Sequence, residues 1–123
     1  WEDEGESIKS KNARKQKIYT REELKKMRAS LIQEKSKVIK PLEDKISVIE
    51  ETIELKEKAL GLNTEKLIQA SMDKDINFLA EGPKIDKELK NELEKLYSEL
   101  SSATEEFENK NEFYRIKMME LDS

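Results

Sequence analysis

The chain has 123 residues, of which 42% are charged and 35% hydrophobic, and its formal net charge at pH 7 is -4. This is too little apolar material for a wide globular core, so long helices that pack through a narrow apolar seam are favoured over an enzyme fold. The absence of Cys and His removes disulfides, thiol nucleophiles and the usual zinc ligands, and we expect a non-catalytic segment without a metal site or cofactor.

Charge is distributed unevenly along the chain. Residues 1–7 have a net charge of -4, residues 8–40 carry 12 Lys or Arg against three Glu for a net charge of +9, and residues 41–123 have a net charge of -9. A basic third beside an acidic remainder indicates a polyanion or an acidic partner.

Residues 1–19 show no apolar periodicity and are rich in Lys, Ser, Asn and Glu. This composition predicts an acidic-then-basic linker that is flexible in isolation. The acidic start is unlike a signal peptide, and no apolar run reaches the roughly 20 residues needed to cross a bilayer. We therefore expect a soluble chain with no membrane contact.

A helix is predicted over about 20–40. Thr20 and Glu23 have the spacing of a capping box. In this motif the side chain of each residue accepts a hydrogen bond from the backbone amide of the other. Pro41 has no amide hydrogen and clashes with the carbonyl four residues earlier, so the pattern favours a new helix over about 41–72 with Pro41 in its first turn. A continuous but kinked helix is the alternative.

The stretch 41–60 carries the seam of a coiled coil, with apolar residues at alternating steps of four and three. Lys56 fills one seam position, as Lys110 does in the final helix, and both are interpreted as long side chains that snorkel past their neighbours, with control of register as the alternative. Gly61 and Asn63 are expected to weaken this helix, and Thr64 to cap a short continuation.

The polar residues 73–75 predict a turn, with Asp75 as the N-cap of a helix over about 76–121 that Gly82 and Pro83 are expected to break. Because each seam has a partner in its own chain, the predicted fold is all-α: an antiparallel two-helix coiled-coil hairpin over 20–123, preceded by a basic helix and a disordered tail. This arrangement also predicts a monomer, with an intermolecular coiled coil as the alternative.

The basic run is the strongest candidate for a binding site. Lys and Arg along a flexible arm and one helix face can neutralise nucleic-acid phosphates without reading bases. The alternative is that these residues form a solvated surface that only keeps the chain soluble. The run continues through Lys35, Lys37 and Lys40. The residues predicted to supply most of the binding are Lys11, Arg14, Lys15, Lys17, Arg21, Lys25, Lys26 and Arg28.

The C-terminal end is apolar on more than one face, through residues such as Phe113, Tyr114, Ile116, Met118 and Met119. The favoured interpretation is that these residues cover the first helix, so that Tyr114 lies beside the 24–38 segment. The alternative is a docking surface, which would make the chain a structural or protein-binding arm with no nucleic-acid contact.

The stretch REELKKMRASLIQEKSKVIKPLEDKISVIEE resembles the start of the C-terminal coiled-coil domain of ATP-binding cassette proteins of the F subfamily (ABC-F). The order of basic linker, short basic helix, Pro-Leu, polar turn and second helix carries the resemblance over about 11–106. The resemblance implies that the intact protein is a cytoplasmic ATPase that uses ATP and Mg²⁺, and that this domain binds DNA or ribosomal RNA, with the ribosome as a further partner. No phosphate-binding loop occurs in these residues, so no ATP site is carried over.

Overall fold

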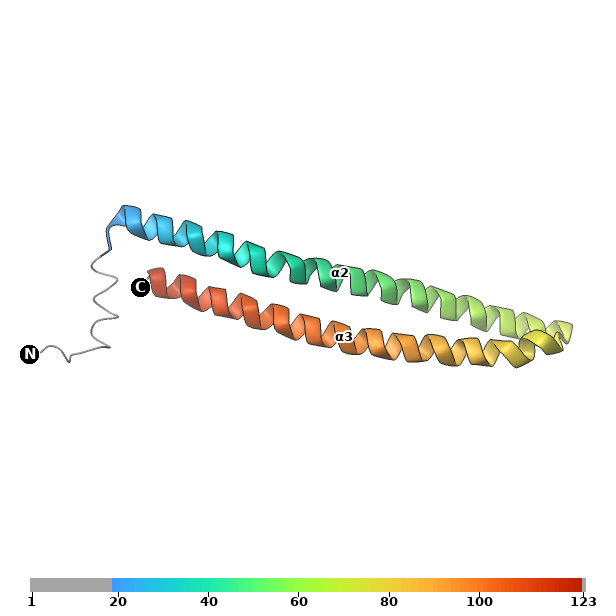
Figure 1. Cartoon of the computed structure of the whole chain (residues 1–123). Helices are drawn as coiled ribbons and strands as arrows, with labels where there is room; N and C mark the ends of the chain where they lie inside the picture. The colour runs from blue at the N-terminus through green and yellow to red at the C-terminus, as the bar shows by residue number, and fades with distance from the viewer. Residues whose placement is uncertain (1–18, 123) are drawn as a thin grey trace, which may run out of the picture. The chain divides into compact units, whose positions relative to one another are not determined.

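A computed structural model describes residues 19–122 of the chain. It contains two helices, α2 (Arg21–Asp73) and α3 (Ile76–Asp122), joined by a turn at residues 74 and 75 (Figure 1). The predicted all-α helical hairpin is therefore confirmed. The predicted tail over 1–19 lies almost wholly outside the described residues.

The start of α2 is fixed by the predicted capping box. The Thr20 amide donates to Glu23 Oε1 at 2.8 Å, and the Glu23 amide donates to Thr20 Oγ1 at 3.1 Å. Two amides of the first turn that have no partner within the helix are thereby satisfied.

The turn ends α2 and starts α3 through local backbone chemistry. Lys74 adopts a left-handed conformation with a φ of 57°, and the Asp75 amide donates to the Ala70 carbonyl at 2.9 Å, as in a Schellman motif. Asp75 then caps α3, because its Oδ1 accepts from the Phe78 amide at 3.2 Å. The predicted turn and N-cap are both confirmed.

Replacing Lys74 by glycine should raise the free energy of unfolding by about 0.5–1 kcal/mol, because glycine adopts positive φ without the clash of a Cβ. Thermal denaturation followed by circular dichroism measures the change. Lys66→Gly, in the middle of α2, is the control and should lower stability by about 1 kcal/mol. A destabilising effect of Lys74→Gly would contradict the left-handed turn.

The two prolines do not interrupt the helices, contrary to expectation. α2 runs through Pro41 and α3 runs through Pro83. Pro41 is exposed, whereas Ile39 and Leu42 on either side of it are buried. Burial of these neighbours offsets the roughly 3 kcal/mol cost of a proline inside a helix.

The expected weakening around Gly61 is also absent, since α2 continues to Asp73. Thr64 does not cap a new helix. Its hydroxyl donates to the Leu60 carbonyl at 3.1 Å, which is a bond that a helical threonine makes to the preceding turn.

The chain divides into two compact units, and α2 and α3 each contribute a segment to both. The first unit contains the described residues 19–41 and 108–122. Its helices run antiparallel, since Arg28 pairs with Asp122 and the Tyr114 hydroxyl donates to Glu34 Oε2 at 3.0 Å. The expectation that Tyr114 lies beside the first helical segment is confirmed.

The second unit is Leu42–Phe107, which includes the turn. Its core is a line of seam residues from both helices, in which Ala103 is the most buried at 1% exposure. The buried members are Ile49, Ile53, Leu93 and Ala103, with Ile46, Leu60, Leu96 and Leu100 packed against them. Heptad packing predicted from the sequence therefore forms this core.

In both helices the phase of the seam shifts from the regular heptads. In α2, Val38, Leu42 and Ile46 are separated by two consecutive steps of four, as are Ala103, Phe107 and Asn111 in α3. Such a double step locally unwinds a left-handed supercoil. In both helices it falls at the border between the units.

The shift in α3 corrects the assignment of Lys110 to the seam. Lys110 is exposed and the neighbouring Asn111 is half-buried, whereas Lys56 is half-buried as predicted. Lys56 Nζ lies 2.9 Å from Glu92 Oε1, so its ammonium reaches the edge of the seam and pairs there.

Candidate nucleic-acid interface

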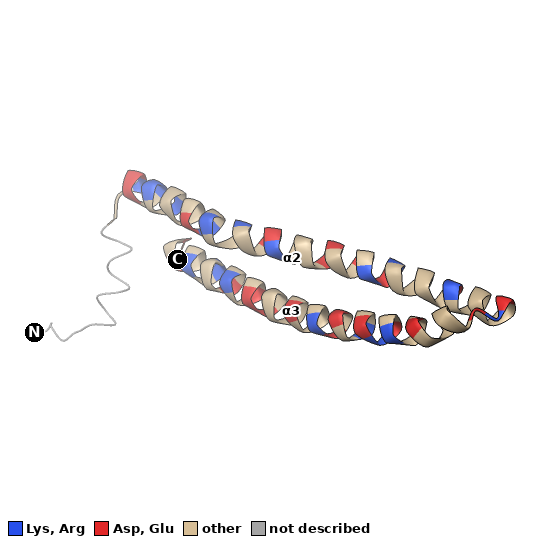
Figure 2. Cartoon of the chain, turned by 45° about the vertical axis from the view of Figure 1, so that its right-hand side comes forward, with Lys and Arg blue, Asp and Glu red and all other residues tan. Residues whose placement is uncertain are grey.

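Four of the eight predicted binding residues, Lys11, Arg14, Lys15 and Lys17, lie outside the described residues. The other four lie on the first two turns of α2, where Lys and Arg gather in Figure 2. The structure therefore places only the helical half of the predicted site, and binding by either half stays a prediction.

Arg28 is not part of an open cationic surface. Its guanidinium pairs with the Asp122 carboxylate, 94 residues further along the chain. Both side chains are about half exposed, so the pair is a surface ion pair that contributes at most about 1 kcal/mol. Its clearer role is to join the beginning of α2 to the end of α3 within the first unit.

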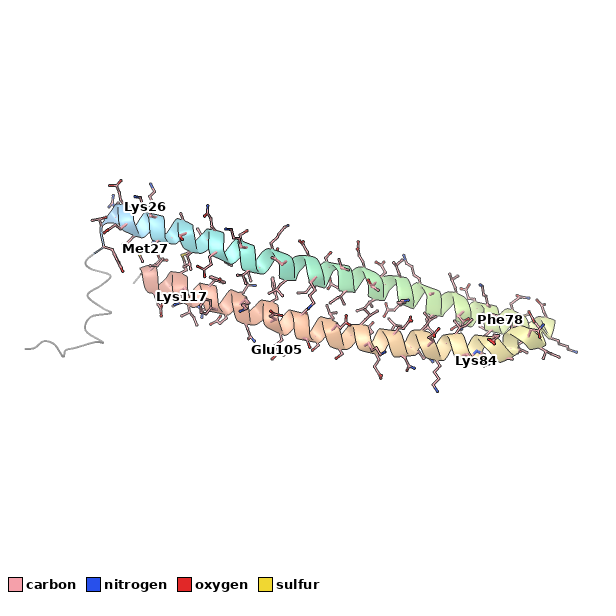
Figure 3. All side chains as sticks on the ribbon, in the orientation of Figure 1. Lys26, Met27, Phe78, Lys84, Glu105 and Lys117 are labelled. Atoms are coloured by element: carbon pink, nitrogen blue, oxygen red, sulfur yellow. The ribbon has the colours of Figure 1, made fainter. Side chains whose placement is uncertain are left out.

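Arg21, Lys25 and Lys26 are exposed, and within the described part of the chain none of them has an ion-pair partner. Figure 3 shows Lys26 on the side of α2 that faces away from α3, whereas Met27 lies toward α3. These ammonium and guanidinium groups are therefore free to meet an anion in solvent.

Two further lysines extend this surface along the same helix. At about 100° per residue, Lys37 and Lys40 fall in the same sector of α2 as Lys25 and Lys26, and Arg21 lies at the edge of this sector. We call these five residues the basic face. Glu22 also falls in this sector, whereas Glu23 and Glu34 lie outside it.

The two units differ in charge. The described residues of the first unit contain 10 Lys or Arg and seven Asp or Glu, whereas Leu42–Phe107 contains nine and 17. The cationic surface is thus confined to the first unit, and acidic side chains dominate the second. A polyanion would be attracted to the first unit and repelled by the second.

A groove of about 300 Å³ lies between the two helices of the first unit. Apolar side chains of Leu31, Tyr114 and Met118 line it, together with Lys35 and Arg115. Burial and the hydrogen bond to Glu34 raise the pKa of the Tyr114 hydroxyl, so this group stays protonated and continues to donate. Asp122 also lines the groove, so apolar side chains, two cations and one acid meet there.

Beside this groove, α3 exposes Phe113, Ile116 and Met119, which we call the C-terminal apolar patch. Lys117 Nζ lies 5.4 Å from the centre of the Phe113 ring, within cation–π range. Arg115 is held by Glu112 at 2.8 Å, and this hydrogen bond lowers the pKa of the Glu112 carboxyl. The predicted covering role is therefore met by Tyr114 and Met118, whereas the patch stays open.

Within residues 19–122 there is no group of three acidic side chains that could hold a metal ion. The ATP and Mg²⁺ implied for the intact protein by the family resemblance find neither a phosphate-binding loop nor a three-acid metal site among these described residues. None of the described helices is long and apolar enough to cross a bilayer.

Comparison with family models, with curated proteins and with solved structures returns no match to this chain. The resemblance to the ABC-F coiled-coil domain therefore rests on the sequence features alone.

Proposed function

We propose that this chain is a non-catalytic nucleic-acid-binding domain that contacts the phosphate backbone of DNA or ribosomal RNA. The observation that supports the proposal is the basic face of α2, whose five cations are exposed and have Glu22 as the one acid in their sector. From Arg21 to Lys40 this face is about 28 Å long, enough to reach phosphates on both sides of a groove about 12 Å wide.

The chemistry of the face favours contact without base reading. Lys and Arg that project from one helix neutralise phosphates, and the described residues of the face include no aromatic side chain for stacking on bases. By resemblance, the domain would belong to a cytoplasmic ATPase of the ABC-F type that acts on ribosomes. The cations of the linker, Lys11, Arg14, Lys15 and Lys17, would add to the same phosphate contacts.

Glutamine at Arg21, Lys25 and Lys26 together should weaken binding to duplex DNA and to structured RNA and should reduce the slope of log K against log salt. Loss of three phosphate contacts lowers that slope by about 2.7 for duplex DNA. Fluorescence anisotropy at several salt concentrations measures both quantities, and circular dichroism checks that the variant is folded.

The matched control changes the net charge equally but leaves the basic face intact. Glutamine at Lys66, Lys87 and Lys95, which are exposed in the second unit, should leave the slope unchanged. If both triple variants lose the same affinity, or if wild-type binding does not depend on salt, the proposed interface is wrong.

A second candidate, a protein-binding arm, is favoured by the C-terminal apolar patch. Phe113 is 47% exposed and Met119 is 55% exposed, although both are large apolar side chains next to a groove. This candidate predicts no salt-dependent binding to nucleic acid, so the same titration separates it from the proposed function.

A further inference from the structure

The second unit carries a second apolar seam on the outside of α2. Five residues, spaced by alternating steps of four and three, fall on one side of the helix about 100° from the buried seam. We call them the outer stripe: Val48, Thr52, Leu55, Ala59 and Leu62. Their spacing is that of a coiled coil, yet Val48, Leu55 and Leu62 are exposed, whereas Thr52 and Ala59 are half-buried.

The exposure of the outer stripe is large for apolar side chains. Val48 is 60%, Leu55 66% and Leu62 59% exposed, whereas Ile49 and Ile53 in the buried seam are each 6% exposed. Isolated apolar residues on a surface need no explanation, but a row at heptad spacing over about 21 Å has the form of a helix-binding face.

Two cross-helix contacts show which side of α3 borders the outer stripe. Lys56 lies on the same side of the buried seam as Leu55, and it pairs with Glu92 at 2.9 Å. Glu57 lies on the opposite side of that seam and accepts a hydrogen bond from the Tyr97 hydroxyl. The stripe therefore borders the Glu92 side of α3, and Tyr97 marks the far side.

That side of α3 is acidic. Steps of four and seven residues place Glu88, Glu99 and Glu106 on the same side of α3 as Glu92. Lys95 lies among them, and Lys84 and Lys110 lie four residues beyond the two ends of the row. We call the four glutamates the acidic row. An apolar stripe bordered by such a row matches a helix that has an apolar seam and cations along one flank.

We propose that the outer stripe and the acidic row form a docking site for an amphipathic helix of another protein, with Lys or Arg along the flank that lies over α3. Apolar contact with Val48, Leu55 and Leu62 supplies the affinity, and the acidic row sets the orientation of the bound helix. A second copy of this chain fits the site poorly. If two outer stripes packed against each other, the acidic rows of the two copies would lie at the same interface and repel each other.

The test uses the full chain and two synthetic helical peptides of about three heptads, both with Leu at the seam positions. One peptide has Lys at the flanking positions, and the other has Glu there. Anisotropy titrations at about 0.15 M salt, where screening limits non-specific attraction, measure the dissociation constants. The Lys peptide should bind saturably, and the Glu peptide should bind at least about tenfold more weakly.

Two variants address the two halves of the site. Val48→Ser with Leu55→Ser and Leu62→Ser should weaken binding of the Lys peptide by about tenfold or more. Glu88→Gln with Glu99→Gln and Glu106→Gln should weaken it by a similar factor. All six side chains are exposed, so the melting temperature of each variant should stay close to that of the wild type.

Matched controls remove equal apolar surface or equal charge elsewhere on the unit. Serine at Ile68, Met72 and Ile76 replaces exposed apolar residues near the turn, and glutamine at Glu50, Glu94 and Glu105 removes acids outside the row. Neither control should change the dissociation constant more than about twofold.

Three outcomes would overturn the proposal. The first is absence of saturable binding of the Lys peptide to the wild type. The second is an equal loss of binding in the control variants. The third is that the wild-type chain sediments as a dimer and the serine triple variant of the stripe as a monomer. The occupant of the stripe would then be a second copy of the chain. None of these outcomes bears on phosphate binding by the first unit.

Discussion

Ile53→Ala should lower the free energy of unfolding by about 2–4 kcal/mol, because it removes a buried side chain from the core of the second unit. A loss of this size is a large part of the roughly 5–15 kcal/mol that stabilises a typical domain. Chemical denaturation of both proteins, followed by the circular dichroism signal of the helices, measures the difference in their free energies of unfolding.

The control for Ile53→Ala is Leu55→Ala, two residues further along the same helix. Leu55 is 66% exposed on the outer stripe, so its truncation should change stability by no more than about 0.5 kcal/mol. If Leu55→Ala were as destabilising as Ile53→Ala, the stripe would be covered in the isolated chain, and both the seam assignment and the proposed docking site would fail.

Gly82→Ala should destabilise the hairpin by about 1–3 kcal/mol. By helix propensity alone, alanine would instead stabilise the helix by about 1 kcal/mol relative to glycine. A Cβ at residue 82 would lie 2.9 Å from Leu67 Cγ and 3.0 Å from Phe78 Cε2, and closer still to Leu67 Cδ2. The Gly82 carbonyl also accepts a hydrogen bond from Nδ2 of the buried Asn63 at 2.9 Å, which fixes the close approach of the helices. The following Pro83 further disfavours a helical conformation for any residue at 82 that has a Cβ.

Gly61→Ala is the matched control, since nothing lies within 4 Å of a Cβ built at residue 61. It should stabilise the chain by about 0.5–1 kcal/mol through helix propensity alone. Combining Gly82→Ala with Leu67→Ala should cost less than the two single losses together, because the shared clash is relieved. Equal and stabilising effects of the two glycine substitutions would show that the helices are further apart at Gly82 than described.

Local chemistry explains why the hairpin was predictable. The capping box at Thr20, the turn at 73–75 and the N-cap at Asp75 each depend on residues within a few positions of one another, so their signals are present in short stretches of sequence. Heptad spacing likewise identified the buried seam around Ile49 and Ile53.

The errors arose where long-range packing overrides a local rule. Pro41 and Pro83 are helix breakers by their own chemistry, but α2 and α3 continue through them. At Pro41, burial of Ile39 and Leu42 on either side favours the continuous helix. Lys110 was placed in the seam because regular heptads were extended past Phe107, where the spacing shifts by one residue to Asn111.

The basic face was only partly predictable for the same reason. Exposure of Lys25 and Lys26 follows from helical spacing, but the pairing of Arg28 with Asp122 joins residues 94 positions apart, and no local pattern indicates it. The outer stripe was visible as spacing alone. Its significance required knowledge of which side of α2 the second helix covers, which the contact between Lys56 and Glu92 supplies.

The double step of four at the border of the units has a consequence for how the length of this protein can change. The heptad register on one side of the border does not depend on the number of heptads on the other side. Adding one whole heptad to α2 and one to α3 within the second unit should therefore leave two contacts of the first unit unaltered, the pair of Arg28 with Asp122 and that of Tyr114 with Glu34. The second unit can therefore gain residues in matched heptads on α2 and α3 without a change in the contacts of the first unit.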